Sequence, residues 1–130
     1  MTQTPSMTPL QAWLLAIRPK TLPAAVAPVL VGVGLAIADG AFRALPALAA
    51  LAGSLLLQMG VNVANDYFDY VKGVDTAERK GPVRVTQSGL IAPECVRRGM
   101  IAIFGLSALV GLYLVIVGGW PILAVGAAAV

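Results

Sequence analysis

Long hydrophobic stretches alternate with short polar ones along this chain, and the hydrophobic stretches approach or exceed membrane length. Three intervals contain no charged residue: 21–38, 44–65 and 99–130. Because a membrane-spanning helix needs roughly 20 apolar residues, the third interval is too long for one span. It contains Gly118-Gly119-Trp120-Pro121, which is typical of a turn. The pattern therefore predicts spans at about residues 21–38, 45–65 and 99–117 and the start of a fourth at 121–130.

The composition is that of a membrane protein. Of the 130 residues, 58% are hydrophobic and only 12% are charged, whereas soluble domains carry about 25% charged residues. We expect an all-α integral membrane protein, a multi-span helical bundle that forms a single transmembrane domain over residues 1–130. Since the chain stays apolar up to Val130, we expect it to be the N-terminal part of a longer protein. The alternative is a three-span protein whose last segment lies along the membrane interface.

The basic residues lie almost entirely on one side of the predicted membrane. Eight of the nine Lys and Arg residues precede the first span or lie between the second and the third, and the exception is Arg43. Cytoplasmic segments carry an excess of Lys and Arg in membrane proteins. We therefore expect a multi-pass protein of the inner (plasma) membrane, with the N-terminus and the loop at 66–98 in the cytoplasm.

A polar cluster follows the second apolar stretch. Asn62, Asn65, Asp66 and Asp69 are spaced i, i+3, i+4 and i+7, so on a helix they share one face. Amide and carboxylate oxygens suit a hard divalent cation and, through it, a phosphate. The sequence has no histidine and a single cysteine, Cys95, which excludes a zinc site built from His and Cys ligands.

The loop at 66–98 is rich in both signs of charge, with five of the six acidic residues and six of the nine basic ones. Carboxylates can hold Mg²⁺ while Lys and Arg contact the remaining phosphate oxygens. Gly73 is expected to end or bend the helix, which frees Asp75 from the helical register. The alternative is a solvated cap that only orients the protein, and this fits residues such as Lys72, Arg97 and Arg98 taken singly.

The order of short motifs after the second span resembles one enzyme family. Residues 65–69 (NDYFD), 72–75 (KGVD) and 81–84 (GPVR) together resemble the first aspartate-rich motif of the UbiA-type intramembrane prenyltransferases. Within that superfamily they are most similar to the 1,4-dihydroxy-2-naphthoate prenyltransferases of menaquinone synthesis, and residues 18–22 (RPKTL) and 87–89 (QSG) fit the same branch. One departure concerns Asp69 and Asp75, which are six residues apart, whereas the wider superfamily spaces these aspartates four apart.

The resemblance implies a cofactor, substrates and roles for individual residues. Asn65, Asp66 and Asp69 would hold a catalytic Mg²⁺ against the diphosphate of a polyprenyl donor. Six further residues would bind the substrate and its diphosphate: Lys20, Arg18, Lys72, Arg84, Asn62 and Asp75. The prenyl group would pass to 1,4-dihydroxy-2-naphthoate, which loses CO₂ to give a demethylmenaquinol. The lipid bilayer is the other expected partner, and no nucleic acid is expected.

Two other functions remain open from the sequence. One is a sister prenyltransferase with another aromatic acceptor, such as 4-hydroxybenzoate. The other is a non-catalytic membrane subunit that handles cations or supports assembly, although a transporter would be expected to carry ionisable residues inside its spans. The family's second aspartate-rich motif is absent from these 130 residues, so they hold half of a two-part metal site and are not expected to be active alone.

Overall fold

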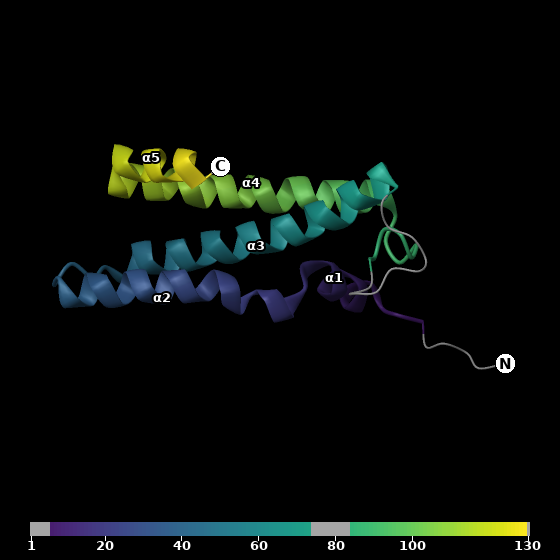
Figure 1. Ribbon diagram of the computed structural model, residues 1–130, viewed down its shortest axis with the longest axis horizontal. Coiled ribbons are helices and arrows are strands. Elements are labelled where there is room, and N and C mark those ends of the chain that lie inside the picture. The colour runs from purple at the N-terminus through teal and green to yellow at the C-terminus, as the bar shows by residue number, and fades with distance from the viewer. Residues whose placement is uncertain (1–5, 74–83, 130) are drawn as a thin grey trace.

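The computed structural model describes residues 6–73 and 84–129, and every regular element within them is a helix. In chain order these are α1 (Pro9–Ile17), the short 3₁₀ helix η1 (Pro19–Thr21), α2 (Pro23–Ala38), α3 (Ala44–Lys72), α4 (Pro93–Gly118) and α5 (Trp120–Ala129). Figure 1 shows an elongated arrangement in which α3 lies between α2 and α4, and α5 turns back along the end of α4. The all-helical class predicted from the sequence is confirmed.

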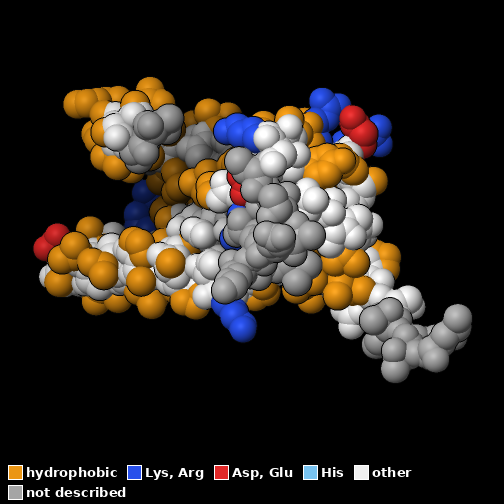
Figure 2. Space-filling view, turned by 45° about the vertical axis from the view of Figure 1, so that its right-hand side comes forward, with side chains coloured by type: hydrophobic (Ala, Val, Ile, Leu, Met, Phe, Trp, Pro, Cys, Tyr) orange, Lys and Arg blue, Asp and Glu red, His pale blue; other side chains and the backbone are white. Residues whose placement is uncertain are grey.

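The long helices have the length and composition of membrane spans. α3 and α4 are each long and apolar enough to cross a bilayer, and the pair formed by residues 9–21 and α2 passes the same test as one span bent by 50°. Hydrophobic side chains are spread widely over the face in Figure 2, and charged side chains occupy only a few patches. Leu30, Leu109 and Ile116 are among the large side chains that point outward. The protein is a multi-pass membrane protein.

Helix α3 is the centre of the structure, since α1, α2 and α4 all pack against it. Two glycines allow α4 to come close. A Cβ atom on Gly60 would lie 2.9 Å from the ring of Phe104, and one on Gly53 would lie 3.2 Å from Val110. On the other side, the Ser54 hydroxyl donates to the carbonyl of Ala25 in α2. Small residues and interhelical hydrogen bonds of this kind hold helices together in lipid.

Helix α1 was not expected from the sequence, because residues 1–11 are polar and the first span was predicted to begin at residue 21. The helix begins with a capping box, in which Thr8 and Gln11 exchange side-chain and backbone hydrogen bonds. It ends at Arg18, whose φ of 57° is left-handed, and Pro19 follows directly. Helix α1 is thus a short helix separate from α2, and the chain turns between the two.

Helix α3 is longer than the charge-free interval that predicted it. Its 29 residues run to Lys72 and end at Gly73, which has a φ of 67°, so the expected helix end at Gly73 is confirmed. At 1.5 Å per residue this length is about 43 Å, more than the roughly 30 Å hydrocarbon core of a bilayer. The last turns of α3 can therefore carry polar side chains beyond the apolar layer.

The other helix ends also differ from the predicted spans. α4 begins at Pro93 rather than near residue 99 and carries the exposed side chains of Arg97 and Arg98 on its first turns. Proline is favoured at the first position of a helix because its missing N–H would have no partner there. Gly119, with a φ of 81°, separates α4 from α5, in agreement with the turn predicted at 118–121.

Candidate functional site

The polar cluster at the end of α3 lies beside two segments that are distant in sequence. Figure 1 places α1 and the chain that enters α4 at the same end of the molecule as the last turns of α3. We call residues 84–92 the α4 entry segment. Its backbone forms a compact turn, in which Ser88 donates to the carbonyl of Arg84 and Leu90 donates to that of Val85.

The α4 entry segment is part of the hydrophobic core. Val85 and Ile91 are buried together with Val63 of α3, Val96 of α4 and the alanines of α1. Burying these side chains removes apolar surface from contact with solvent and holds the segment in place. The polar side chains near this segment are therefore held in place by two packed elements, α3 and the α4 entry segment itself.

Asp66 joins α3 to the α4 entry segment. One carboxylate oxygen accepts from the backbone N–H of Val85 at 2.8 Å, and the other accepts from the backbone N–H of Thr86 at 2.9 Å. The Thr86 hydroxyl also donates to Asp66. The side chain of Asp66 is only 2% exposed. Both of its oxygens are thus occupied by donors from the chain itself.

Asp69, one turn further along α3, forms an ion pair with Arg84. A guanidinium Nη2 atom of Arg84 lies 2.8 Å from a carboxylate oxygen of Asp69. Arg84 is 8% exposed and the Asp69 side chain 31%, so the pair is covered on the arginine side and open on the carboxylate side. Because bulk water screens a covered ion pair less than an exposed one, Asp69 and Arg84 attract each other more strongly than an exposed pair would.

Asn62 faces a different part of the molecule. Its Nδ2 atom donates to the carbonyl of Ile17 at 2.7 Å and to the hydroxyl of Thr21 at 2.8 Å. The carbonyl belongs to the last turn of α1, where helical carbonyls lack partners within the helix. Asn62 therefore holds the turn between α1 and α2 against α3, and its amide group is occupied there.

The remaining predicted residues are on the surface or outside the described part of the chain. Asn65, Lys20 and Lys72 are exposed, and Arg18 is half-buried. Asp75 lies outside the described residues. The structure thus brings Asp66, Asp69 and Arg84 together and directs Asn62 elsewhere.

Thr86 and the buried backbone of Val85 were not among the residues predicted from the sequence. The only sequence signal near them is the Gln87-Ser88-Gly89 turn, which predicts a tight loop but not its partner. Their contact with Asp66 joins residues 19 and 20 positions apart. A helical-face pattern cannot indicate such a contact.

The accessible oxygen atoms at this site supply only some of the ligands that a Mg²⁺ ion needs. Asn65 and Asp69 are one turn apart on α3, and both reach the surface. Mg²⁺ in proteins commonly uses only one or two carboxylates and takes its other ligands from phosphate and water. Within residues 6–73 and 84–129, no group of three or more His, Cys, Asp and Glu side chains could hold a metal ion. The metal site predicted at Asn65, Asp66 and Asp69 stays a prediction.

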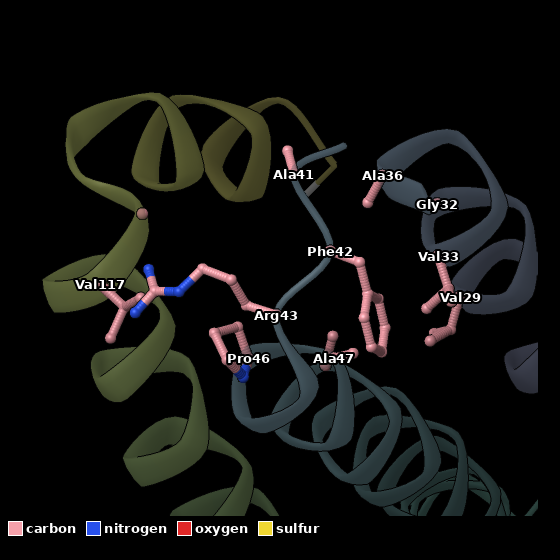
Figure 3. A pocket seen from close by; sticks show the side chains of 12 residues that line it. Val29, Gly32, Val33, Ala36, Ala41, Phe42, Arg43, Pro46, Ala47 and Val117 are labelled. Carbon is pink, nitrogen blue, oxygen red and sulfur yellow. The ribbon is translucent and has the colours of Figure 1, made fainter. Parts of the chain in front are cut away.

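A separate pocket of about 360 Å³ lies at the opposite end of α3. Figure 3 shows Phe42 pointing toward Val29 and Val33 of α2, and Arg43 pointing toward α4. The pocket lining is apolar apart from Arg43. It contains no acidic side chain and is not part of the candidate site.

Sequence comparison with known proteins finds one matching family. The model of the UbiA prenyltransferase family matches residues 25–130. The chain is 49% identical over 107 residues to 1,4-dihydroxy-2-naphthoate octaprenyltransferase of Escherichia coli (82% of this chain, 35% of the relative). It is 43% identical over 115 residues to the protein of the same name from Mycobacterium tuberculosis (88% and 39%). No solved structure gives a significant match.

The chain therefore spans little more than a third of the length of these curated relatives. The family match nevertheless covers most of this chain, from the start of α2 through α3 and α4 to the last residue. It includes the whole polar cluster of α3 and the α4 entry segment. This protein belongs to the UbiA prenyltransferase family.

Proposed function

We propose that the full-length protein transfers a polyprenyl group from polyprenyl diphosphate to 1,4-dihydroxy-2-naphthoate in menaquinone synthesis. The observation that carries the proposal is the Asp69–Arg84 pair at the end of a membrane-length helix. It combines an open carboxylate with a fixed guanidinium, which is what a metal-bound diphosphate requires. The names of the relatives, all dihydroxynaphthoate octaprenyltransferases, favour this acceptor.

Asn65 and Asp69 are the proposed Mg²⁺ ligands that are open to the surface. Asp66, the third proposed ligand, can join them only if it shares or exchanges its hydrogen bonds with Val85 and Thr86. When bound, Mg²⁺ neutralises the negative charge that develops on the leaving diphosphate. Asp75 was also proposed to bind the substrate, and it lies outside the described residues.

Arg84 is the proposed contact for the diphosphate oxygens that the metal does not bind. Its planar guanidinium matches the geometry of phosphate oxygens, and because it is only 8% exposed the diphosphate would have to displace what covers it. Lys20 and Lys72 are exposed and are proposed as further contacts of the same anion. Arg18 is proposed for the same role. Asn62 would act indirectly, since it holds the turn that carries Lys20.

The apolar helices are proposed to enclose the prenyl chain and keep water from the reacting carbon. A dry site protects the allylic cation that forms as the diphosphate leaves. The positive-inside rule favours a cytoplasmic site, because eight of the nine basic residues fall on that side of the predicted topology. Water-soluble dihydroxynaphthoate and the diphosphate group would then meet at the cytoplasmic surface of the membrane.

The proposal is tested with the full-length protein in membranes supplied with polyprenyl diphosphate and one aromatic acceptor at a time. We expect a prenylated product from 1,4-dihydroxy-2-naphthoate, release of CO₂, and loss of turnover when EDTA removes Mg²⁺. Product from 4-hydroxybenzoate alone would assign the protein to a sister branch of the family. No product with any aromatic acceptor would contradict the enzymatic proposal and favour a non-catalytic membrane subunit.

A further inference from the structure

We propose that Asp66 and Thr86 form an anchor that holds the α4 entry segment on α3 and thereby positions Arg84 for the diphosphate. The last step of this inference rests on the proposed function. The anchor itself does not, because it follows from contacts within the chain. It assigns Asp66 the role of a positioning residue in place of the third metal ligand, and introduces Thr86 as its partner.

The contacts of Asp66 have the chemistry of an anchor. Two consecutive backbone N–H groups and one hydroxyl donate to its two oxygens. Val85 and Thr86 are buried along with Asp66, so water cannot easily replace the carboxylate. Hydrogen bonds to an ionised acceptor are about twice as strong as neutral ones. An asparagine in place of Asp66 would accept through one oxygen only and turn an NH₂ group toward a donor.

The anchor acts on Arg84 because the two are adjacent in the chain. The Val85 N–H that binds Asp66 belongs to the peptide group that links Val85 to Arg84. Asp69, which lies three residues after Asp66 on the same face of α3, binds the guanidinium of Arg84. The segment is therefore held at two points, once through its backbone and once through the Arg84 side chain.

Exposure separates the roles of the two aspartates. Asp66 is sealed in the core, whereas nearly a third of the Asp69 side chain is open. Asp69 can therefore reach a ligand directly, and Asp66 acts on the ligand through the segment that it holds. Loss of the anchor would leave Arg84 attached to a looser segment and weaken the binding of the prenyl diphosphate.

Hydrogen–deuterium exchange of the full-length protein in lipid nanodiscs, without Mg²⁺ or substrate, tests the anchor. We expect slow exchange at the Val85 and Thr86 amides of the wild type. Asp66→Asn should accelerate it by about tenfold or more, because hydrogen bonds to a charged acceptor are lost. Thr86→Val, which keeps the side-chain volume and removes only the hydroxyl, should accelerate it a few-fold. Glu94→Gln, which neutralises an exposed carboxylate at the start of α4, is the control and should leave these two amides unchanged.

Steady-state kinetics of the same variants test the positioning of Arg84. Thr86→Val should raise KM for polyprenyl diphosphate several-fold and leave the half-saturating Mg²⁺ concentration within about twofold of the wild type. Asp66→Asn should raise the same KM further. If Asp66→Asn accelerates exchange throughout α3 and α4 because the protein unfolds, the Thr86→Val variant decides the outcome.

Three results would count against specific parts of the inference. Wild-type exchange rates at Val85 and Thr86 in both variants would overturn the anchor. Accelerated exchange in Thr86→Val with an unchanged KM would overturn the positioning of Arg84. A large shift in Mg²⁺ half-saturation for Thr86→Val would also overturn it, since the effect would then run through the metal. A wild-type protein without prenyl transfer would contradict the proposed function, and the exchange measurement would still decide the anchor.

Discussion

The side-chain amide of Asn62 in α3 donates to the main-chain carbonyl of Ile17 in α1, at 2.7 Å. The same nitrogen donates to the hydroxyl of Thr21, which in turn donates to the carbonyl of Arg18. One polar side chain of the central helix thus holds both sides of the turn that separates α1 from α2. The turn contains the left-handed residue Arg18, and it carries Lys20 on its outer surface.

Replacing Asn62 with alanine should destabilise the protein. The substitution removes the Asn62 donor from the part-buried carbonyl of Ile17 and leaves the Thr21 hydroxyl with only the longer hydrogen bond from Gln58, at an expected cost of about 1–3 kcal/mol. Thermal unfolding in detergent measures the loss. The matched control is Asn65→Ala, which removes the same group from an exposed position of the same helix and should leave the unfolding temperature nearly unchanged. Equal shifts for the two variants would contradict the role assigned to Asn62.

Adding one methyl group at Gly60 should separate α3 from α4. The new Cβ would lie 2.9 Å from the Phe104 ring, so the ring or the helix must move, at an expected cost of about 1–3 kcal/mol. Thermal unfolding again provides the measurement. The same substitution at Gly105 of α4, which has no neighbouring atom within 4 Å, should be neutral or slightly stabilising because alanine favours the helix.

A second substitution tests whether the clash is with Phe104. Gly60→Ala combined with Phe104→Leu should lose less stability than the sum of the two single variants, because leucine leaves room for the methyl group. Simple additivity would show that the cost of Gly60→Ala arises elsewhere.

Removing the guanidinium of Arg84 should weaken binding of the prenyl diphosphate far more than removing that of Arg97. Arg84 is buried and fixed against Asp69, whereas Arg97 and its partner Glu94 are 49% and 69% exposed. An exposed pair is worth only about 0–1 kcal/mol. We expect Arg84→Ala to raise KM by at least about tenfold, a loss of about 1.4 kcal/mol or more in binding free energy, and Arg97→Ala to have little effect.

Lysine should restore the function of Arg84 only in part. A lysine ammonium is a point charge without the planar fork that can contact Asp69 and a phosphate together. Activity of Arg84→Lys equal to that of the wild type would show that charge alone is required at this position.

Asp69 should govern the dependence on Mg²⁺. Of the two aspartates Asp66 and Asp69, Asp69 has the more accessible carboxylate, and Asp69→Ala removes it. We expect turnover to fall by at least about a hundredfold, because losing one group that stabilises transition-state charge has an effect of this size. Asp69→Asn should retain weak activity with a much higher half-saturating Mg²⁺ concentration. Glu94→Ala, which removes an exposed carboxylate at the start of α4, is the control and should keep the Mg²⁺ titration of the wild type.

The membrane class and the helical content of this protein were predictable from its sequence. The three charge-free intervals correspond to α2, to most of α3, and to α4 with α5. The end of α3 was predicted from Gly73, and the break at Gly119 was predicted from the Gly-Gly-Trp-Pro stretch at 118–121. Hydrophobicity, helix length and turn propensity are properties of neighbouring residues, so a one-dimensional pattern carries them. Helix α1 was not predicted, because its short apolar stretch lies between a polar terminus and a proline.

The tertiary structure decided what each polar side chain of α3 contacts. The sequence placed Asn62, Asn65, Asp66 and Asp69 on one helical face and predicted a shared site. In the fold, Asn62 contacts a carbonyl 45 residues earlier and Asp66 contacts amides 19 and 20 residues later. Asn65 is exposed, and Asp69 pairs with Arg84.

The physical reason is that a buried polar group must find a partner, and the partner depends on which segments pack beside it. Helical periodicity determines the direction of a side chain relative to its own helix. The turn after α1 and the α4 entry segment come to α3 from distant parts of the chain, and only their packing decides whether an oxygen meets a backbone amide, an arginine or solvent. The sequence by itself therefore determined a membrane helix with a polar end, and the fold divided that end between structural contacts and an open site.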